Sequence, residues 1–437
     1  MRVSVLLIAA ALAACAADSP RVVGVLEIAP VWSGHPVGFD LLTAGNRQFV
    51  AFYDDRRRMT VGARTLGADR WKLVRLASQV EWDSHNYITM VADDEGYLHL
   101  SGNMHVKPLI YFRTTRPWDV ESFEPIHKMT GADETRCTYP RFFRGAGGEL
   151  IFTYRDGKSG NGNQIYNVYD LKTRTWRRLL DQPLTDGQGR MNAYLHGPVR
   201  GPDGFFHLVW VWRDTPDCAT NHDLTYARSR DLLRWETSTG KPLTLPVRVE
   251  TGEIVDPIPV KGGIINGAAK LGWDSRKRPV ITYHKFDERG RTQAYNARLE
   301  DGRWKIYRTS KWDYRWEFQG GGSIESEVRL GTVRPGRKGE LLLGYNHIKY
   351  GSGTWRLDER TLQPLGTLPV ERAWPEQLAR PESSFPGMQV QLGPPQPGPH
   401  GIIYLLRWET LGRNRDRPRE GPLPGPSMLR LYELAGG

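Results

Sequence analysis

The sequence predicts an all-β fold, a seven-bladed β-propeller of four-stranded antiparallel blades. Three observations support this prediction. A pattern of short strands recurs at intervals of about 45–60 residues, each interval accommodates about four strands, and no segment carries the 3.6-residue periodicity of a helix over several turns. A large β-sandwich is the alternative fold, but a sandwich does not require a repeat.

Each repeat has the same order of features: an apolar strand, a turn rich in Asp and Gly, an aromatic strand, a third strand and a closing strand that carries a tryptophan. The first repeat is predicted to contain Phe39–Thr43, Arg47–Asp54, Arg58–Leu66 and Trp71–Leu76. Six further repeats are predicted, at 82–123, from 139, from about 193, from 265, at about 323–368 and at about 389–434. The last is interrupted by a Pro- and Gly-rich segment, 413–427. The segment Val22–Ile28 is predicted to complete the last blade, since an open ring would leave unpaired strand edges.

The second repeat contains two histidines at the ends of its strands. This repeat is predicted to have a third strand at 108–113, and its first two strands, Tyr87–Ala92 and Tyr97–Gly102, are joined by an Asp-Asp-Glu-Gly turn and are therefore antiparallel. The start of the first strand and the end of the second then lie at the same end of the sheet. We therefore expect His85 and His105 to lie close together at one rim, although ordinary surface histidines are the alternative.

The N-terminus is predicted to be an export signal, residues 1–17. Arg2 supplies a positive charge, and Val5–Ala14 is an apolar run that is too short to span a membrane. The sequence Leu12–Cys15 has the form of a bacterial lipobox, in which Cys15 would be lipidated; cleavage after Ala17 is the alternative. The protein is thus expected to be periplasmic, an outer-membrane lipoprotein attached to the membrane through Cys15, or extracellular. Residues 18–437 are predicted to form a single propeller domain.

The composition favours an acidic polysaccharide partner. The net charge of the 437-residue chain is +11, but the basic residues are dispersed and no nucleic-acid-binding motif is present, so no nucleic acid is expected. The 15 Trp and 18 Tyr can stack on sugar rings, although strands favour the same residues. Three Cys do not make a disulfide scaffold. A monomer is expected, because a closed ring leaves no obligatory edge.

Further candidate residues follow from the same strand geometry. A GxSxG elbow, an HExxH helix and a phosphate-binding loop are absent from the sequence. In the third repeat, Tyr139 precedes the first strand and Arg155 ends the second, and the fourth repeat opens with Tyr194 and His196. These four residues are expected at the same rim as the two histidines, with Tyr194 and His196 binding substrate.

This set of residues suits β-elimination of a uronate. Arg155 can offset the charge of the substrate carboxylate bidentately, His85 or Tyr139 can remove the C5 proton, and Tyr139 or His105 can protonate the departing O4. No nucleophile, metal or other cofactor is required. The structural alternatives are a turn ion pair between Arg155 and Asp156 and a packed aromatic side chain for Tyr139.

Three sequence segments resemble a known family. The motifs WDSHNY…SGNMH, TYPRFF…FTYRDG and TNHDLTYARS resemble the BNR-4 group of seven-bladed propellers, which includes ulvan lyases and the lyases and rhamnosidases that act on rhamnose-α-1,4-glucuronate. The resemblance to the ulvan lyases implies a catalytic set of two His, a Tyr and an Arg, which corresponds here to His85, His105, Tyr139 and Arg155.

The same family implies two other sites. Its rhamnosidases use one histidine near the N-terminus, on the opposite face of the ring, and the segment Val31–Phe39 is similar to that site, with His35 as the candidate. Some members bind a structural cation, and the C-x3-H spacing of Cys218 and His222, together with His196, can supply zinc ligands.

These observations predict an exported polysaccharide lyase, a carbon–oxygen lyase that cleaves next to a glucuronate by β-elimination in a rhamnose-glucuronate or ulvan-like substrate. An α-L-rhamnosidase-type glycoside hydrolase that uses His35 is the first alternative. Glycosidases usually use two carboxylates, so a hydrolase centred on one histidine would be chemically unusual. A glycan-binding propeller without catalytic activity is the second alternative.

Overall fold

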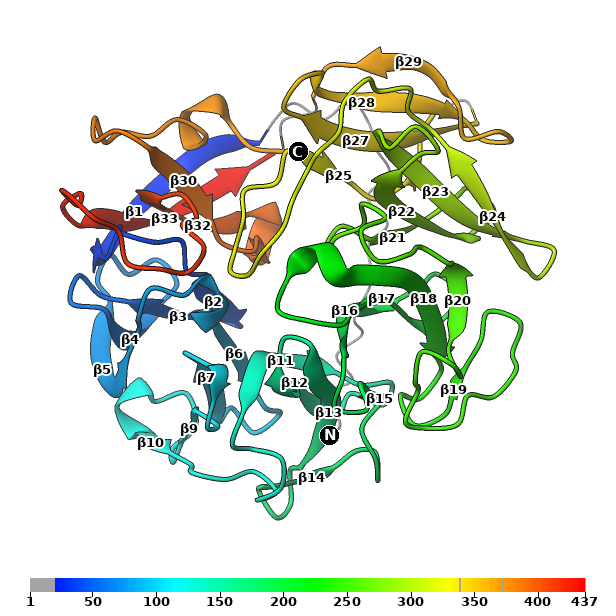
Figure 1. The fold of residues 1–437 in the computed structure, drawn as a ribbon. Coiled ribbons are helices and arrows are strands. Elements are labelled where there is room, and N and C mark those ends of the chain that lie inside the picture. The colour runs from blue at the N-terminus through cyan, green and yellow to red at the C-terminus, as the bar shows by residue number, and fades with distance from the viewer. Residues whose placement is uncertain (1–19, 338, 371–372, 437) are drawn as a thin grey trace.

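The computed structural model describes residues 20–337, 339–370 and 373–436. In this part of the chain, seven antiparallel sheets follow one another around a ring (Figure 1). Each sheet contains four principal strands, in sequence order from the inside of the ring outward except that β1 is the outermost strand of the last sheet, which confirms the predicted propeller. The predicted signal segment, 1–17, lies outside the described residues, and Cys15 lies there with it.

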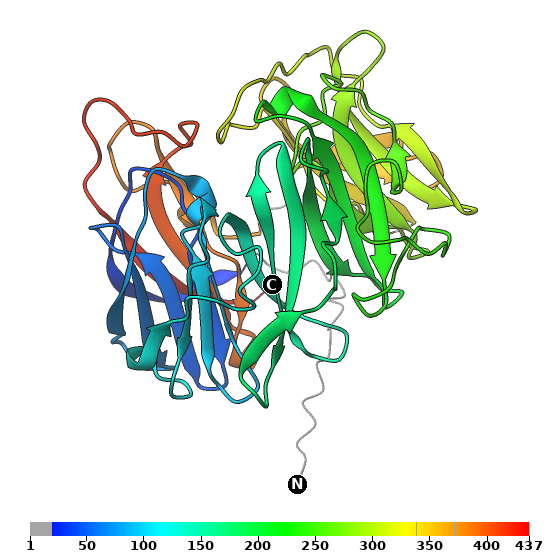
Figure 2. The ribbon, with the colours of Figure 1, turned by 60° about the horizontal axis from the view of Figure 1, so that its bottom comes forward.

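The first three blades contain the strands that position most of the site. Blade 1 consists of β2 (Asp40–Ala44), β3 (Arg47–Tyr53), β4 (Arg58–Thr65) and β5 (Lys72–Gln79). Blade 2 consists of β6 (Ile88–Ala92), β7 (Leu98–Gly102), β9 (Tyr111–Thr114) and β10 (Phe123–Pro125). Blade 3 consists of β11 (Cys137–Arg144), β12 (Leu150–Lys158), β13 (Asn161–Asp170) and β14 (Thr175–Arg178), with the short strands β8 (His105–Lys107) and β15 (Thr185–Asp186) added. Figure 2 shows blade 3 between its two neighbours.

The remaining blades follow the same plan. Blade 4 consists of β16 (Asn192–Arg200), β17 (Phe206–Arg213), β18 (Asn221–Ser229), β19 (Trp235–Glu236) and β20 (Glu253–Asp256). Blade 5 consists of β21 (Lys270–Trp273), β22 (Pro279–Phe286), β23 (Thr292–Glu300) and β24 (Arg303–Arg308). Blade 6 consists of β25 (Val328–Leu330), β26 (Arg334–Pro335), β27 (Glu340–His347), β28 (Gly351–Asp358) and β29 (Pro364–Leu368).

Blade 7 contains both ends of the described chain. It consists of β30 (Met388–Leu392), β31 (Gln396–Pro397), β32 (Ile403–Leu411), β33 (Ser427–Ala435) and β1 (Arg21–Val31). Strand β1 pairs antiparallel with β33, from the pair Arg21 and Ala435 to the pair Val31 and Ser427. The prediction that the first strand completes the last blade is therefore confirmed, and Figure 1 shows β1 (blue) beside β33 (red).

Helical structure in the described residues is limited to short 3₁₀ turns. These turns are η1 (Ser84–Asn86), η2 (Val120–Ser122), η3 (Cys218–Thr220), η4 (Glu376–Leu378) and η5 (Pro399–Gly401). None of the helices in this part of the chain has the length and apolar character needed to cross a membrane.

The aspartates of the predicted turns fix the local conformation. Asp54, Asp93 and Asp274 each accept hydrogen bonds from the backbone amides two and four residues later, at distances of 2.9–3.0 Å. A carboxylate in this position satisfies the amides that a tight turn leaves unpaired. The Asp-rich turns of the sequence therefore hold the hairpins of three different blades.

Apolar packing between blades holds the ring together across its closure. One buried cluster contains Phe52 from blade 1, Leu98 from blade 2 and Leu406 from blade 7, each 0% exposed. Because the same cluster contacts the first and the last blade, the pairing of β1 with β33 is supported by a continuous core. Burial of each such side chain contributes roughly 1.5–3 kcal/mol to stability.

One strand differs from the sequence prediction. The third strand of the second repeat, expected at 108–113, begins only at Tyr111, and the upstream residues His105–Lys107 form β8, which pairs with β11 of the next blade. In this pairing Thr138 lies opposite His105, and the Thr138 hydroxyl accepts a hydrogen bond of 2.8 Å from the Val106 amide. The inner strand of blade 3 offers a free edge that β8 fills, so His105 is held by blade 3 as well as by blade 2.

Candidate active site

A cavity of about 680 Å³ lies where the loops at the inner strands of several blades meet. Its lining comes from blades 2 to 6 and from one residue of the loop between β32 and β33. Four of the predicted site residues line this cavity: His85, His105, Tyr139 and Tyr194.

The two histidines are stacked. His85 lies in η1, whose N-cap is Asp83, and His105 lies in β8. Their ring centroids are 4.2 Å apart with an interplanar angle of 28°. The prediction that these residues meet at one rim is confirmed, and the contact follows from the antiparallel register in which Ile88 pairs with Gly102.

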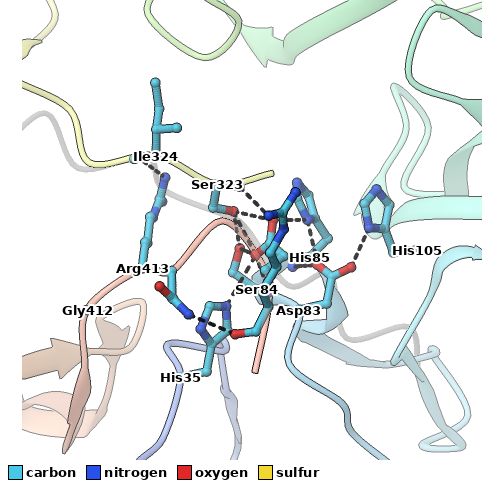
Figure 3. A network of polar contacts seen from close by, with 12 residues as sticks. His35, Asp83, Ser84, His85, His105, Ser323, Ile324, Gly412 and Arg413 are labelled. Carbon is cyan, nitrogen blue, oxygen red and sulfur yellow. Dashed lines mark hydrogen bonds and ion pairs between the residues drawn. The ribbon is translucent and has the colours of Figure 1, made fainter. Parts of the chain in front are cut away.

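One carboxylate bridges both imidazoles. The Asp83 oxygens lie 2.6 Å from Nδ1 of His85 and 2.5 Å from Nδ1 of His105, and Figure 3 shows the Asp83 carboxylate beside both rings. Burial alone would raise the pKa of Asp83, but the hydrogen bonds from His105 and His85 outweigh it and hold this pKa well below its usual range. An ionised carboxylate only accepts hydrogen bonds, so each Nδ1 carries a proton, and in the neutral form of either ring the lone pair is then on Nε2.

A β-bulge directs Tyr139 toward the histidines. The register between β11 and β12 shifts between Thr138 and Arg141, and Tyr139 within this shift has φ of 60°. A tyrosine in the left-handed region is strained, and such bulges reorient side chains near functional sites. The Tyr139 ring meets the His85 ring edge-on, with centroids 5.5 Å apart and an interplanar angle of 61°.

The hydroxyl of Tyr139 is held in its protonated form. Burial is the largest effect on the pKa of this hydroxyl and raises it well above the ordinary value of 10, and the neighbouring Tyr194 raises the pKa further. The Arg155 guanidinium opposes this shift, because a nearby cation favours the phenolate. Tyr139 is therefore a proton donor at neutral pH.

Arg155 lies behind the two tyrosines rather than in the cavity wall. Its guanidinium carbon is 4.9 Å from the centroid of Tyr139 and 5.8 Å from that of Tyr194. The residue is 2% exposed, and within the described part of the chain Nε, Nη1 and Nη2 have no hydrogen-bond partner. The prediction that Arg155 lies near Tyr139 is confirmed. Arg155 does not line the cavity, however, so in this conformation it cannot form the expected bidentate contact with a substrate carboxylate. Nor does Arg155 form the alternative turn ion pair, since Asp156 pairs with Arg136 at 3.2 Å.

The two predicted substrate-binding residues of blade 4 differ in their positions. Tyr194 lines the cavity, and its hydroxyl contacts Ser159 Oγ at 2.5 Å and accepts a hydrogen bond of 3.3 Å from Arg213. His196 lies two residues further along β16 but is absent from the cavity lining. Burial, and then the positive charges of Lys270 and Arg141, lower the pKa of His196 to about 4.

The stability of the protein should fall as the solution is acidified from pH 6.5 to pH 4. In this range the unfolded chain binds a proton at His196 that the folded chain does not bind, because the folded pKa of about 4 lies below the ordinary value of 6.5. The contribution is complete above pH 6.5 and is lost toward pH 4, by roughly 3 kcal/mol at most for this residue. Urea unfolding at several pH values measures the decline, and His196→Gln should make it shallower. If the free energy of unfolding fell equally steeply with decreasing pH in the wild-type protein and in His196→Gln, this expectation would be contradicted.

His35 is placed differently from what the family resemblance implies. It lies in the loop before the inner strand of blade 1, which corresponds to the position of His85 in blade 2, so both histidines belong to the same rim and not to opposite faces. Nε2 of His35 lies 3.2 Å from Asp416 Oδ1, and Asp416 in turn accepts a hydrogen bond from Ser84. His35 is 1% exposed and lines none of the cavities described.

The predicted zinc ligands are not assembled. His222 uses both ring nitrogens for carboxylates, Nδ1 at 3.0 Å from Asp223 and Nε2 at 2.9 Å from Asp214. Cys218 is a buried free thiol. The proposed group of Cys218, His222 and His196 is therefore a wrong prediction: in the described part of the chain, these side chains do not come within ligand distance of one another.

Among the described residues, Asp83, His85 and His105 form the only group of three side chains of metal-ligating type (His, Cys, Asp or Glu) that lie within ligand distance of one another. Their N–O separations of 2.5 and 2.6 Å are lengths of charge-assisted hydrogen bonds. Two ligands of one tetrahedral zinc ion would stand about 3.3 Å apart. The arrangement is thus a hydrogen-bonded triad.

Sequence reasoning missed three residues of the site. Asp83 stands two positions before His85, and this spacing is the signal that could have revealed it. Arg213 ends β17 and lines the cavity. Asp416 belongs to the segment that interrupts the last repeat, 332 residues from its partner Ser84, so no local pattern connects the two.

A family comparison identifies the group to which the protein belongs. A family model described as a BNR repeat-containing family member matches residues 47–312 of the chain. The chain belongs to this BNR_4 family. The match begins at β3 of blade 1 and extends through blade 5, and therefore includes His85, His105, Tyr139 and Arg155.

Ulvan lyases are among the curated proteins similar to this BNR_4 family member. The short isoform from Alteromonas sp. (strain LOR) is 27% identical over 176 residues, which are 37% of this chain and 28% of that protein. The long isoform from Pseudoalteromonas sp. (strain PLSV) is 27% identical over 121 residues, 26% of this chain and 12% of that protein. The chain thus matches less than a third of the length of these relatives.

Solved structures share the fold of this BNR_4 protein. The polysaccharide lyase Uly1 has a TM-score of 0.61 at 13% identity, covering 95% of this chain and 99% of Uly1. A PL25 ulvan lyase bound to -[GlcA(1-4)Rha3S]- has a TM-score of 0.57 at 14% identity, covering 90% of this chain and 97% of that one. At these identities the likeness establishes the propeller fold.

Proposed function

We propose that this protein is a polysaccharide lyase that cleaves next to a uronate by β-elimination. The observation that carries the proposal is the pair of histidines bridged by Asp83, stacked in one cavity beside the protonated Tyr139. The pair supplies a base with a free lone pair and Tyr139 supplies an acid, which are the two groups that the reaction requires. The similarity to ulvan lyases supports the same reaction class.

His85 is the proposed base. Its Nδ1–H is held by Asp83, so Nε2 is free to take the C5 proton of the uronate. The C5–H bond breaks, its electron pair forms the C4=C5 double bond, and the C4–O4 bond breaks with its electron pair passing to O4. Asp83 stabilises the imidazolium that forms, as a buried carboxylate does when it orients a histidine base. His85 is preferred over His105 because its ring directly meets Tyr139.

Tyr139 is the proposed acid. Its hydroxyl proton passes to the departing O4, which leaves a phenolate. The Arg155 guanidinium, 4.9 Å from the centre of the ring, stabilises this anion through a low-dielectric interior. Arg155 thus acts on Tyr139 rather than on the substrate. Transfer of the proton from His85 back to Tyr139 through solvent restores both groups.

The substrate carboxylate is proposed to meet basic residues of the cavity wall. The cationic side chains in the lining include Lys158, Arg213, Lys270 and Arg413. Burial lowers the pKa of Lys270, because a low-dielectric environment disfavours the charged ammonium group. A carboxylate in the cavity would offset this concentration of positive charge, and the net charge of +11 draws acidic chains toward it.

The substrate is proposed to contain glucuronate next to rhamnose, as in the fragment -[GlcA(1-4)Rha3S]- bound in one structure of similar fold. We propose export of the chain through the signal segment 1–17, lipidation at Cys15, and a single monomeric propeller as the mature protein.

The geometry favours the lyase over the two alternatives. A rhamnosidase that uses His35 would need this residue to touch substrate, yet its side chain is 0% exposed. A propeller that only binds glycans would not need a bridged histidine pair beside a buried tyrosine hydroxyl. The cavity itself can serve either a lyase or a binding protein.

The test is to incubate the purified protein with ulvan and with other glucuronate-bearing glycans, and to follow ultraviolet absorbance. The C4=C5 double bond absorbs, and a hydrolysis product does not. We expect absorbance to rise without release of free rhamnose. Release of rhamnose without absorbance would instead favour the hydrolase, and His35→Ala would then abolish it. Binding without either product would favour the glycan-binding propeller.

A further inference from the structure

The loop between β32 and β33 contributes a buried carboxylate to the proposed active site. Asp416 lies in this loop, and its side chain is 7% exposed. Both Arg415 and Asp416 have positive φ, 52° and 56°. Left-handed backbone at two consecutive non-glycine residues costs free energy, and such strain persists only where surrounding contacts impose it.

Asp416 is surrounded by hydrogen-bond donors from three other parts of the chain. Its Oδ1 accepts hydrogen bonds from the Ser84 amide at 3.0 Å and the Ser84 hydroxyl at 2.9 Å, and lies 3.2 Å from Nε2 of His35. Its Oδ2 accepts from the Ser323 amide at 2.7 Å and hydroxyl at 2.9 Å. Figure 3 shows His35, Ser84 and Ser323 gathered in this network.

The same carboxylate reaches His85. Oδ2 of Asp416 lies 3.5 Å from Nδ1 of His85, which also contacts Asp83 at 2.6 Å. The titratable groups that face His85 are thus Asp83, Asp416, His105 and Tyr139. Although burial opposes it, the hydrogen bond from His35 and the charge of His85 hold the pKa of Asp416 well below its usual range. Nδ1 of His85 therefore lies between two ionised carboxylates.

We propose that Asp416 is a positioning residue for His85. It fixes the turn Ser84–Asn86 through the Ser84 amide and hydroxyl, and its charge favours the proton on Nδ1. In the neutral imidazole both effects select the Nδ1–H tautomer, which leaves the lone pair of His85 on Nε2. The role of His85 as base rests on the proposed function, but the electrostatic coupling between Asp416 and His85 does not depend on it.

The test compares Asp416→Asn with Asp416→Glu and with a control, Asp170→Asn. Asp170 also accepts two backbone amides in a turn, from Lys172 and Thr173, but it lies outside the cavity. With ulvan as substrate, we expect Asp416→Asn to lower kcat by about a hundredfold, as misplacement of a catalytic group does, with KM within about twofold. The control should match the wild-type protein.

The pH dependence separates positioning from a merely structural role. Loss of the negative charge beside Nδ1 disfavours the imidazolium, so the acid limb of the kcat/KM profile should move to lower pH by about half a unit or more in Asp416→Asn. Asp416→Glu keeps the charge and should leave this limb in place while lowering kcat. Thermal unfolding shows which variants fold, and either of the two Asp416 variants is sufficient for the kcat comparison. Wild-type kcat and an unmoved acid limb in the folded variants would overturn the proposal.

A measurement without substrate distinguishes failure of this inference from failure of the proposed function. NMR titration of the His85 ring, identified by its loss in His85→Gln, should show a lower midpoint in Asp416→Asn than in the wild-type protein. If the wild-type protein has no lyase activity but this midpoint falls, the coupling holds and the lyase proposal fails. If the midpoint is unchanged, the coupling between Asp416 and His85 is absent.

Discussion

Replacing Tyr139 with Phe should lower the rate of double-bond formation by about a thousandfold, because general acid catalysis contributes about 10²–10⁴-fold. The substitution removes one oxygen atom. It keeps the ring that meets His85 edge-on and that covers the Arg155 guanidinium. The rise of ultraviolet absorbance with ulvan measures the rate. The substitution should leave the fold intact, because the Tyr139 hydroxyl has no hydrogen-bond partner among the residues that the structure describes, and substrate binding should therefore remain close to that of the wild-type protein.

Tyr432→Phe is the matched control, because Tyr432 is a buried tyrosine of blade 7 that is remote from the cavity lining. This variant should retain full activity. If Tyr139→Phe retained more than about a tenth of the wild-type rate, the acid would have to be another group. His105 would then be the leading candidate, since it lines the same cavity.

Replacing Asp83 with Asn should lower kcat by about 10²–10⁴-fold at neutral pH, by analogy with the loss of a carboxylate that orients a catalytic histidine. An amide has one acceptor oxygen, and Asp83 accepts hydrogen bonds from two imidazoles. The NH₂ group would face one Nδ1 and force that ring to accept, which moves its proton to Nε2. The Nε2 atom of that ring then no longer has a free lone pair, so only one of the two histidines can act as a base.

Glu81→Gln provides the control for this substitution. Glu81 stands two residues before Asp83, is largely exposed and pairs only with Lys107 at 3.3 Å among the contacts described. Its replacement should leave kcat within about twofold, since exposed ion pairs contribute little. If Asp83→Asn and Glu81→Gln had equal activity, the bridged histidines would not be the base.

Strand topology made part of the site predictable. Alternation and turn residues located β6 and β7, and antiparallel pairing then placed His85 beside His105 without any knowledge of their contacts. The same reasoning brought Tyr139 and Tyr194 to the rim. It succeeded because strand direction fixes which chain ends are neighbours, and strand direction follows from the local sequence.

Strand topology did not predict how deeply a side chain is buried, nor which distant segments of the chain contact one another. Alternation places Arg155 near the rim, but packing of Tyr139 and Tyr194 over it decides that its guanidinium lies behind the cavity wall. The strand β8 depends on a free edge in the next blade. His35 and Asp416 meet across 381 residues, and loop conformation rather than strand order determines that contact.

The closure of the ring sets the order of events when the protein is made. Among the strands described, β1 is the first to leave the ribosome and its partner β33 is the last, and Asp416 leaves only shortly before β33. Blades 1 to 6 can be complete while β1 still has no partner and the Ser84–Asn86 turn still lacks its carboxylate. We therefore expect any chain that stops before the last blade to be inactive, although it contains both histidines and Tyr139. Catalytic competence would arise in a single late step, together with the most sequence-distant pairing in the fold.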